Sequence, residues 1–313
     1  MGRIVTVQDA FGPGSESPLT RTLPKVAIIP NLDKPDSRQV MQELTAWLIG
    51  RKIPVGLLPD HAGLAGHPEL ARPLDDLLAW CDFAVVLGGD GTLLNWAKVL
   101  APASKPILGV NLGHLGFLTE IEVPELFDAM PKILEGRYTV ESRMMLEATV
   151  EPAAGAPGES GPSFLALNEI VISKGPFARV VNIETSVGGR LVTTYPADGV
   201  IVATPTGSTA YSLSAGGPIV SPEVGVLIIT PVCPHTFFAR AVVVSAEETV
   251  VLRVVTEHVD TMLTMDGQRG HALAPGDRII VKKASLSARL IRRRGWNFYE
   301  VLKRKLQESG GAS

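Results

Sequence analysis

A chain of 313 residues can bury a sizeable core, and its length makes two domains the first expectation. Apolar residues make up 45% of the chain and charged residues 19%, which excludes a disordered protein and is typical of globular ones. The formal net charge of −3 gives no general attraction to nucleic acid or to an anionic membrane, so neither is expected as a partner. Any anionic ligand must therefore be held by local features.

Both cysteines, Cys81 and Cys233, lie in apolar runs, which predicts buried free thiols and excludes a disulfide framework. None of the histidines has metal-ligand spacing with another His or Cys, so a structural zinc site is not expected. The first twenty residues contain no apolar signal region, and no stretch reaches the ~20 apolar residues that cross a bilayer. We therefore expect a cytoplasmic protein.

The first domain is expected over residues 24–143, after a loosely ordered leader, residues 1–23, that is rich in Gly, Pro and Ser. Val40, Leu44 and Leu48 recur at helical spacing and predict a first helix. Further helices are expected at Leu93–Leu100 and around Glu125–Leu134. The expected strands are Val26–Ile29, Val55–Leu58, Phe83–Leu87 and Ile107–Val110. This alternation of strands and helices predicts a parallel α/β domain.

The pattern changes near Arg143, where short strand-like runs replace the helical signals and predict a second domain over residues 144–296. The expected strands are Met145–Val150, Phe164–Ile172, Val180–Val187, Leu191–Tyr195, Val200–Ala203, Val226–Ile229, Ala241–Val244, Val250–Val255, Met262–Met265 and Arg278–Val281. Glu151–Ser163 is expected to be a flexible loop, and Phe298–Leu306 a final helix. The second domain should therefore be an antiparallel β-sandwich.

The segment Gly88-Gly89-Asp90-Gly91-Thr92 follows a buried strand and opens a helix, which is where an α/β sheet binds phosphates. It carries no lysine of a Walker A loop, and Leu94 stands where a dinucleotide fingerprint requires Gly or Ala. A carboxylate in a phosphate loop would repel its ligand unless it holds Mg²⁺ or accepts a proton from an attacking hydroxyl. Asp90 therefore points to phosphoryl transfer; a turn shaped only for its backbone is the alternative.

Two more loops follow predicted strands and carry groups that suit a ligand. Asn111–Phe117 comes directly after a strand at the same sheet edge as Asp90, so Phe117 could wall the site. Thr204–Gly217 combines hydroxyls, Tyr211 and glycines, which suit sugar and phosphate; a helix cap with turns is the alternative. The pair Asn168-Glu169 lies in an apolar run, where an unpaired carboxylate is costly, so it should face a ligand or a partner.

A lone histidine and a basic cluster remain as weaker candidates. His235 follows a buried strand and could reach a ligand, although a structural role is the more common one for a single histidine. Lys303–Lys305 and Arg292–Arg294 form a basic cluster near the end of the chain. It could dock an anion, but we expect a solvated face.

Taken in order, these segments resemble the NAD kinase family. The resemblance is carried by Gly88–Thr92, Asn168-Glu169, Asp198-Gly199, Thr204–Tyr211 and Asp266-Gly267-Gln268, and it extends from about Lys25 to Leu306. It implies an N-terminal Rossmann-like domain completed by residues 297–313, a C-terminal β-sandwich, and a homodimer or homotetramer. It also implies phosphoryl transfer from ATP to the adenosine-ribose 2′-hydroxyl of NAD, which gives NADP.

The resemblance also implies roles for single residues. Asp90 would be the catalytic proton acceptor, while Gly88, Gly89 and Thr92 would lie close to the phosphates of the donor. The residues that would contact NAD are Gly91, Asn168, Glu169, Arg179, Asp198, Thr209, Ala210, Tyr211, Ser212, Leu213, Ser214 and Gln268. A divalent metal, Mg²⁺ by expectation, would accompany ATP, and inorganic polyphosphate is an alternative donor.

Strand geometry adds one expectation, and two other functions stay open. Asn168 and Glu169 would point to opposite faces of a continuous strand, so both can touch one ligand only if the strand ends or bends there. A lipid kinase of the diacylglycerol or sphingosine type would share the Gly-Gly-Asp-Gly-Thr turn. A non-catalytic NAD(P)-binding sensor would keep the fold without turnover.

Overall fold

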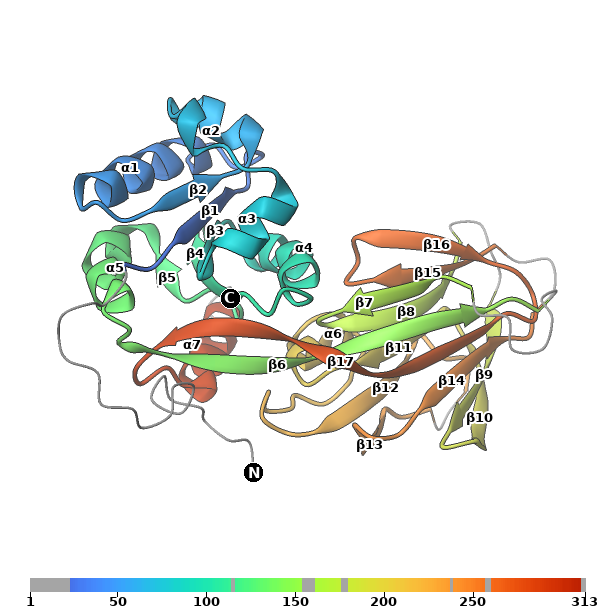
Figure 1. The fold of residues 1–313 in the computed structure, drawn as a ribbon. Helices are drawn as coiled ribbons and strands as arrows, with labels where there is room; N and C mark the ends of the chain where they lie inside the picture. Colours follow the sequence, from blue (N-terminus) through green and yellow to red (C-terminus); the bar gives the residue numbers. More distant parts are fainter. Residues whose placement is uncertain are drawn as a thin grey trace, which may run out of the picture. The chain divides into compact units, whose positions relative to one another are not determined.

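The computed structural model describes residues 23–113, 116–153, 161–175, 180–236, 239–256 and 260–310. The chain divides into two compact units, each described here by itself. Unit 1 comprises the chain up to Ser142 together with Ala288–Ser313, and unit 2 comprises Arg143–Ser287. Figure 1 follows the elements along the chain. The expected leader, residues 1–23, lies outside the described residues except for Leu23.

Unit 1 contains a parallel sheet in the order β2-β1-β3-β4. Its strands are β1 (Val26–Pro30), β2 (Val55–Leu57), β3 (Phe83–Leu87) and β4 (Pro106–Asn111). The last residues of β17 (Arg278–Arg293) and the short β5 (Ile121–Glu122) run parallel to β4. β1 and β3 are buried along their whole length, which explains why their sequences are continuous apolar runs.

Most helices of unit 1 pack on this sheet with their apolar side chains. Val40, Leu44 and Leu48 of α1 are buried in the same core as the strands, which confirms the helix predicted from their spacing. The helices are α1 (Ser37–Gly50), α2 (Pro59–Ala65), α3 (Leu74–Trp80), α4 (Asp90–Leu100), α5 (Leu126–Leu134) and α7 (Phe298–Gly310). The sequence did not predict α2 and α3, because each has only seven residues and too short an apolar period.

Unit 2 is a sandwich of two antiparallel sheets. One sheet has the order β10-β9-β14-β17, with β6 beside β17 and β7; the other has the order β13-β12-β11-β8-β15-β16. The bounds are β6 (Tyr138–Glu151), β7 (Ser163–Ala166), β8 (Glu169–Lys174), β9 (Val181–Val187), β10 (Arg190–Ala197), β11 (Gly199–Ala203), β12 (Val226–Val232), β13 (Val242–Ser245), β14 (Val250–Val254), β15 (Thr261–Met265) and β16 (Arg269–Leu273). Ile172 and Val202 of one sheet share a buried core with Ile183 and Leu252 of the other, which confirms the predicted sandwich.

Unit 2 differs from the sequence expectations at several points, which include the Asn168-Glu169 segment and Cys233. The run predicted as one strand, Phe164–Ile172, is divided into β7 and β8, so the bend expected at Asn168-Glu169 is present. Cys233 is exposed, which corrects its prediction as a buried thiol, whereas Cys81 is buried as expected. Cys233 follows the end of β12 with a φ of 44°, so the chain has left the sheet at this residue.

Candidate active site

The Gly88–Thr92 turn lies at the carboxyl edge of the parallel sheet of unit 1. The order β2-β1-β3-β4 places the reversal of strand order between β1 and β3, the point at which α/β sheets bind ligands. Asn31, which follows β1, donates from Nδ2 to Thr92 Oγ1 at 2.9 Å. A Cβ at Gly88 would overlap the Thr92 side chain, so the turn needs a glycine there. The turn is thereby fixed between the ends of the two strands.

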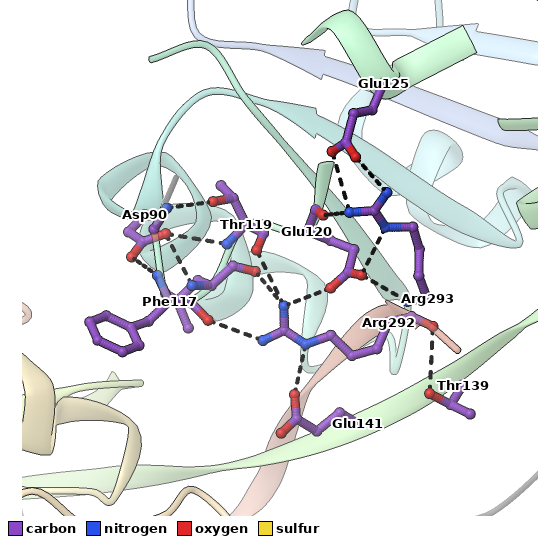
Figure 2. A network of polar contacts seen from close by, with 11 residues as sticks. Asp90, Phe117, Thr119, Glu120, Glu125, Thr139, Glu141, Arg292 and Arg293 are labelled. Atoms are coloured by element: carbon purple, nitrogen blue, oxygen red, sulfur yellow. Dashed lines mark hydrogen bonds and ion pairs between the residues drawn. The ribbon is translucent and has the colours of Figure 1, made fainter. Parts of the chain in front are cut away.

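Asp90 is the first residue of α4, and its carboxylate is held by three successive backbone amides (Figure 2). Phe117 N donates to Oδ2 at 2.8 Å, while Leu118 N at 3.1 Å and Thr119 N at 3.3 Å donate to Oδ1. A carboxylate offers about four acceptor positions, so one position on Oδ2 remains. The structure therefore fixes this side chain and leaves one oxygen able to accept a hydrogen bond from a substrate.

Arg292 holds the same loop by donating hydrogen bonds to the loop's carbonyl groups (Figure 2). Its guanidinium donates to the carbonyls of Phe117–Thr119 at 3.2 to 3.4 Å, to Glu120 Oε2 at 3.2 Å and to Glu141 Oε2 at 2.8 Å. Its side chain is only 2% exposed, and its Cζ lies 4.1 Å from the centre of the Trp296 ring. The loop Phe117–Thr119 thus donates its N–H groups to Asp90, and its carbonyl groups accept hydrogen bonds from Arg292.

Arg293 shares the Glu120 carboxylate and extends the network to Glu125. Its guanidinium lies 3.3 Å from Glu120 Oε1 and 3.1 Å from Glu125 Oε1. Burial raises the pKa of the Glu120 carboxyl, while the charges of Arg292 and Arg293 act against that rise. Arg292 and Arg293 therefore do not form the solvated basic face that the sequence predicted, because Arg292 is buried and both are paired.

Gly116→Ala should lower kcat about tenfold, because a methyl group at this position would overlap the Asp90 carboxylate and displace it. Gly113→Ala is a matched control in the same loop, since no atom of the described residues lies within 4 Å of the position of its Cβ. Steady-state kinetics of the two variants provide the measurement. Equal activity of both would mean that the Asp90 carboxylate tolerates displacement.

Asn111 ends β4 beside the turn and was not singled out by the sequence. Its side chain is only 3% exposed, and among the described residues its Nδ2 has no hydrogen-bond partner. A Cβ at Gly89 would lie 4.0 Å from Asn111 Oδ1, so the amide adjoins the turn. A buried amide donor without a partner is costly, and a ligand acceptor at the turn would satisfy it.

In unit 2, Asp266 fixes the bend between β7 and β8. Its Oδ1 accepts from Asn168 N at 2.8 Å and Glu169 N at 3.2 Å, and its Oδ2 accepts from Leu167 N at 3.2 Å. Asp266 is 6% exposed and has a φ of 52°, in a tight turn with Gly267. The buried Asp266 carboxylate therefore positions Asn168 and Glu169 through their backbone N–H groups; the sequence singled out Asp266 only as part of the Asp-Gly-Gln motif.

The hydroxyl-rich loop after β11 uses many of its hydroxyls internally. Thr204 Oγ1 donates to Leu167 O at 2.7 Å and accepts from Gly207 N at 3.0 Å, and Ser208 Oγ exchanges hydrogen bonds with the backbone of Val220. Ser212 Oγ lies 3.0 Å from Thr230 Oγ1 and is buried. These groups shape the loop, which includes a 3₁₀ turn (Thr206–Thr209) and α6 (Tyr211–Ser214).

Tyr211, Asp198 and Glu169 lie close enough in unit 2 for the two carboxylates to act on the phenol. Partial burial raises the pKa of the Tyr211 hydroxyl, and the carboxylates of Asp198 and Glu169 raise it further, so both carboxylates lie near the phenol. Asp198 is paired with Lys174, with 2.7 Å between Oδ1 and Nζ. Because 44% of Tyr211 is exposed, its ring is available for stacking.

The other expected site residues fall in different places. Gln268 is exposed in the Asp266-Gly267 turn, and His235 is exposed and donates its backbone N–H to Pro196 O at 2.8 Å. Arg179 lies outside the described residues. Within the described ranges no three His, Cys, Asp or Glu side chains could together hold a metal ion. The helices of these ranges include none that is long and apolar enough to span a membrane.

A glycine-rich turn at the switch point of a parallel sheet, with a fixed carboxylate at a helix start, defines a nucleotide-binding α/β protein with a β-sandwich. Family models agree with this class and narrow it. The ATP-NAD kinase N-terminal domain matches residues 73–138, and the ATP-NAD kinase C-terminal domain matches residues 167–293.

Curated relatives and solved structures point the same way. The NAD kinase of Heliobacterium modesticaldum is 46% identical over 287 residues, which cover 91% of this chain and 99% of that protein. The yeast NADH kinase complexed with NADH matches with a TM-score of 0.83 at 26% identity over 94% of this chain and 89% of that one. An Archaeoglobus fulgidus NAD kinase in complex with ATP matches with a TM-score of 0.70 at 26% identity, over 90% and 98% of the two chains. The chain belongs to the NAD kinase family, and it is an enzyme that transfers a phosphoryl group from ATP to NAD.

Proposed function

We propose that Asp90 accepts the proton of the adenosine-ribose 2′-hydroxyl of NAD while this hydroxyl takes the γ-phosphoryl group of ATP, giving NADP and ADP. The observation that carries the proposal is the grip of three backbone amides on the Asp90 carboxylate at the carboxyl edge of the sheet. These hydrogen bonds favour catalysis because an immobile carboxylate can orient a hydroxyl without reorganising during the reaction.

The proposed phosphoryl transfer balances in bonds, electrons and protons. The 2′-oxygen forms a bond to the γ-phosphorus, the bond from that phosphorus to the β,γ-bridging oxygen breaks, and ADP leaves with the bond's electrons. The hydroxyl proton passes to the remaining acceptor position of Asp90 Oδ2. Phosphoryl transfer goes through a loose transition state, which asks chiefly for positioning and charge neutralisation. Asp90 therefore acts first by orienting the hydroxyl.

The residues of unit 2 supply most of the proposed NAD contacts. The bend lets Asn168 and Glu169 both reach one ligand, and the Tyr211 ring is exposed for stacking. Ser212 Oγ already has a partner in Thr230, so we assign its contact to the backbone. The full set of proposed NAD contacts is Gly91, Asn168, Glu169, Arg179, Asp198, Thr209, Ala210, Tyr211, Ser212, Leu213, Ser214 and Gln268, with Phe117 and His235 as further candidates.

Gly88, Gly89 and Thr92 are assigned to the donor phosphates, and Asn111 Nδ2 is a further donor of a hydrogen bond to them. Mg²⁺ is the proposed metal. Because the described residues hold no cluster of three metal-binding side chains, the phosphates of ATP and water would supply most of its ligands, as Mg²⁺ commonly prefers. Bound in this way, the ion would supply positive charge against the transferred group.

The assembly and location are proposals of the same kind. The exposed Leu191 (63%) and Val192 (45%) on the edge strand β10 would suit burial between copies of the chain, which supports a homodimer or homotetramer. We propose a cytoplasmic location, where both substrates occur. Light scattering coupled to size-exclusion chromatography would give the mass of the assembly.

Incubation of the purified protein with NAD, ATP and Mg²⁺ should yield NADP, measured with an NADP-specific dehydrogenase. Parallel reactions replace ATP by polyphosphate, replace NAD by NADH, or add a chelator, which should stop the reaction by removing the metal. An NADP-specific readout also reports the position of the new phosphate. If no NADP forms from any donor, the chain is a family member without turnover, and the non-catalytic sensor replaces the kinase.

A further inference from the structure

Unit 1 contains a pocket of about 610 Å³ that none of the proposed catalytic or donor-binding residues lines. It lies between α5 and the segment that follows β17 and enters α7. Its lining residues are Thr119, Glu120, Ala129, Lys132, Ile133, Arg137, Arg293, Arg294, Gly295, Trp296, Asn297, Glu300, Val301 and Arg304. The volume is within the ~300–1,000 Å³ of ordinary small-molecule sites.

The lining of the pocket is rich in positive charge. It holds five cationic side chains and only two carboxylates, Glu120 and Glu300. Glu120 is already shared by Arg292 and Arg293, and Arg137 is paired with Glu135 at 2.6 Å.

Three of the five cations have no such partner. In the described part of the chain no carboxylate lies within ion-pair distance of Lys132, Arg294 or Arg304, and all three are exposed. Arg304 acts on Glu125 only through longer-range attraction. These three side chains come from α5, from the turn after β17 and from α7, so they approach one space from three elements.

We propose that this pocket binds a small anion with at least two phosphate groups, at a site separate from the one that binds ATP and NAD. The lining also holds one carboxylate without an ion-pair partner among the described residues, Glu300. Cations that come from three elements around a pocket of this volume can still contact more than one phosphate group, each of which carries a charge of about −1.5 to −2 near neutral pH. Guanidinium groups favour such ligands because their planar N–H groups match phosphate oxygens in pairs. Of the basic cluster that the sequence indicated, Arg292 is thus buried against the loop Phe117–Thr119, while Arg293, Arg294 and Arg304 line the pocket.

The pocket adjoins the loop that fixes Asp90. Thr119 lines the pocket, and its backbone N–H donates to Asp90 Oδ1. Glu120 also lines it and is held by Arg293, another lining residue. A bound anion therefore lies against the loop that positions the catalytic carboxylate, which makes the pocket suited to an effector.

Isothermal titration calorimetry with methylenediphosphonate, a diphosphate that cannot be hydrolysed, tests the proposal on the full chain. Saturating NAD and a non-hydrolysable ATP analogue are present throughout, so that the catalytic site is occupied. Binding of one anion per chain is expected. Arg294→Ala and Arg304→Ala should each weaken it about tenfold, which corresponds to about 1.4 kcal/mol.

Lys303→Ala is the matched control, because it removes one positive charge from the same helix at an exposed residue that does not line the pocket. Its affinity should equal that of the unchanged chain, and thermal unfolding should show that all three variants remain folded. Either of two results would overturn the proposal: no binding to the unchanged chain while NAD and the ATP analogue are present, or equal weakening in Lys303→Ala.

Discussion

Asp90→Asn is expected to lower kcat roughly 1,000-fold, within the range by which a positioned proton acceptor contributes. The asparagine side chain has one oxygen in place of two, and its NH₂ group would face an amide that now donates to the carboxylate. The loop Phe117–Thr119 would then move, and the acceptor for the ribose hydroxyl would be lost. The KM for NAD should change little, because no proposed NAD contact in unit 2 is removed.

Steady-state kinetics with NAD and ATP give kcat and KM for the variant, and calorimetric binding of NAD shows whether the site still forms. Asp82→Asn is the control, since the Asp82 carboxylate also accepts a backbone N–H, from Lys25 at 2.8 Å, but stands at the beginning of β3. Its activity should be that of the unchanged protein. If Asp90→Asn kept more than about a tenth of the activity, a carboxylate would not be needed and the proposed step would be wrong.

The fold was largely predictable because its strands are either fully buried or alternate cleanly. Phe83–Leu87 has identical bounds in sequence and structure, since every residue of it is buried and glycine follows at once. The long strand β17 was predicted only to Val281, because two successive charged residues, Lys282 and Lys283, interrupt the apolar pattern there. Its partner β4 lies far away in the sequence, and local pattern cannot report such a pairing.

Candidate positions could be predicted where a residue conflicted with its surroundings. Asp90 in a phosphate loop and Glu169 in an apolar run are both costly without a purpose, and hydrogen bonds hold the Asp90 carboxylate and the backbone N–H of Glu169. The partners that hold them were not predictable. Arg292 reaches Phe117 across 175 residues and Asp266 reaches Glu169 across 97, and no local rule links such pairs.

Residue type alone was misleading in two further cases. The hydroxyls of Thr204, Ser208 and Ser212 suggested a sugar site, but they form hydrogen bonds inside unit 2. Cys233 lies in an apolar run and yet is exposed, because the strand ends one residue before it. Both cases depend on where a strand ends, which is the least certain part of any prediction from sequence.

The two units position their functional groups in the same manner. In each, one aspartate followed by glycine accepts three successive backbone N–H groups of a loop: Asp90 those of Phe117–Thr119, and Asp266 those of Leu167–Glu169. In unit 1 the aspartate is itself the proposed catalytic group. In unit 2 the aspartate is buried, and the residues it holds are the proposed ligand contacts. Asp266 is therefore a positioning residue rather than a catalytic one.

Asp266→Asn should raise the KM for NAD about 100-fold while changing kcat much less. Hydrogen bonds to a charged group contribute roughly 1.5–3 kcal/mol each, and a loss near 2.7 kcal/mol corresponds to that factor in affinity. The asparagine amide would point a donor at the amides of Leu167–Glu169, so the bend would relax and Asn168 and Glu169 would leave their positions. Kinetics at varied NAD concentration separate KM from kcat.

Asp277→Asn separates this positioning role from a general loss of stability. Asp277 is also in unit 2, is 7% exposed and accepts the backbone N–H groups of Ala153 at 2.9 Å and Ala274 at 2.8 Å, but it holds no proposed NAD contact. Both variants should lower the thermal unfolding midpoint, since each leaves buried N–H groups poorly paired. Only Asp266→Asn should raise the KM. An equal rise in both would mean that the bend affects NAD binding only through the stability of the sandwich, and an unchanged KM in Asp266→Asn would remove Asn168 and Glu169 from the NAD site.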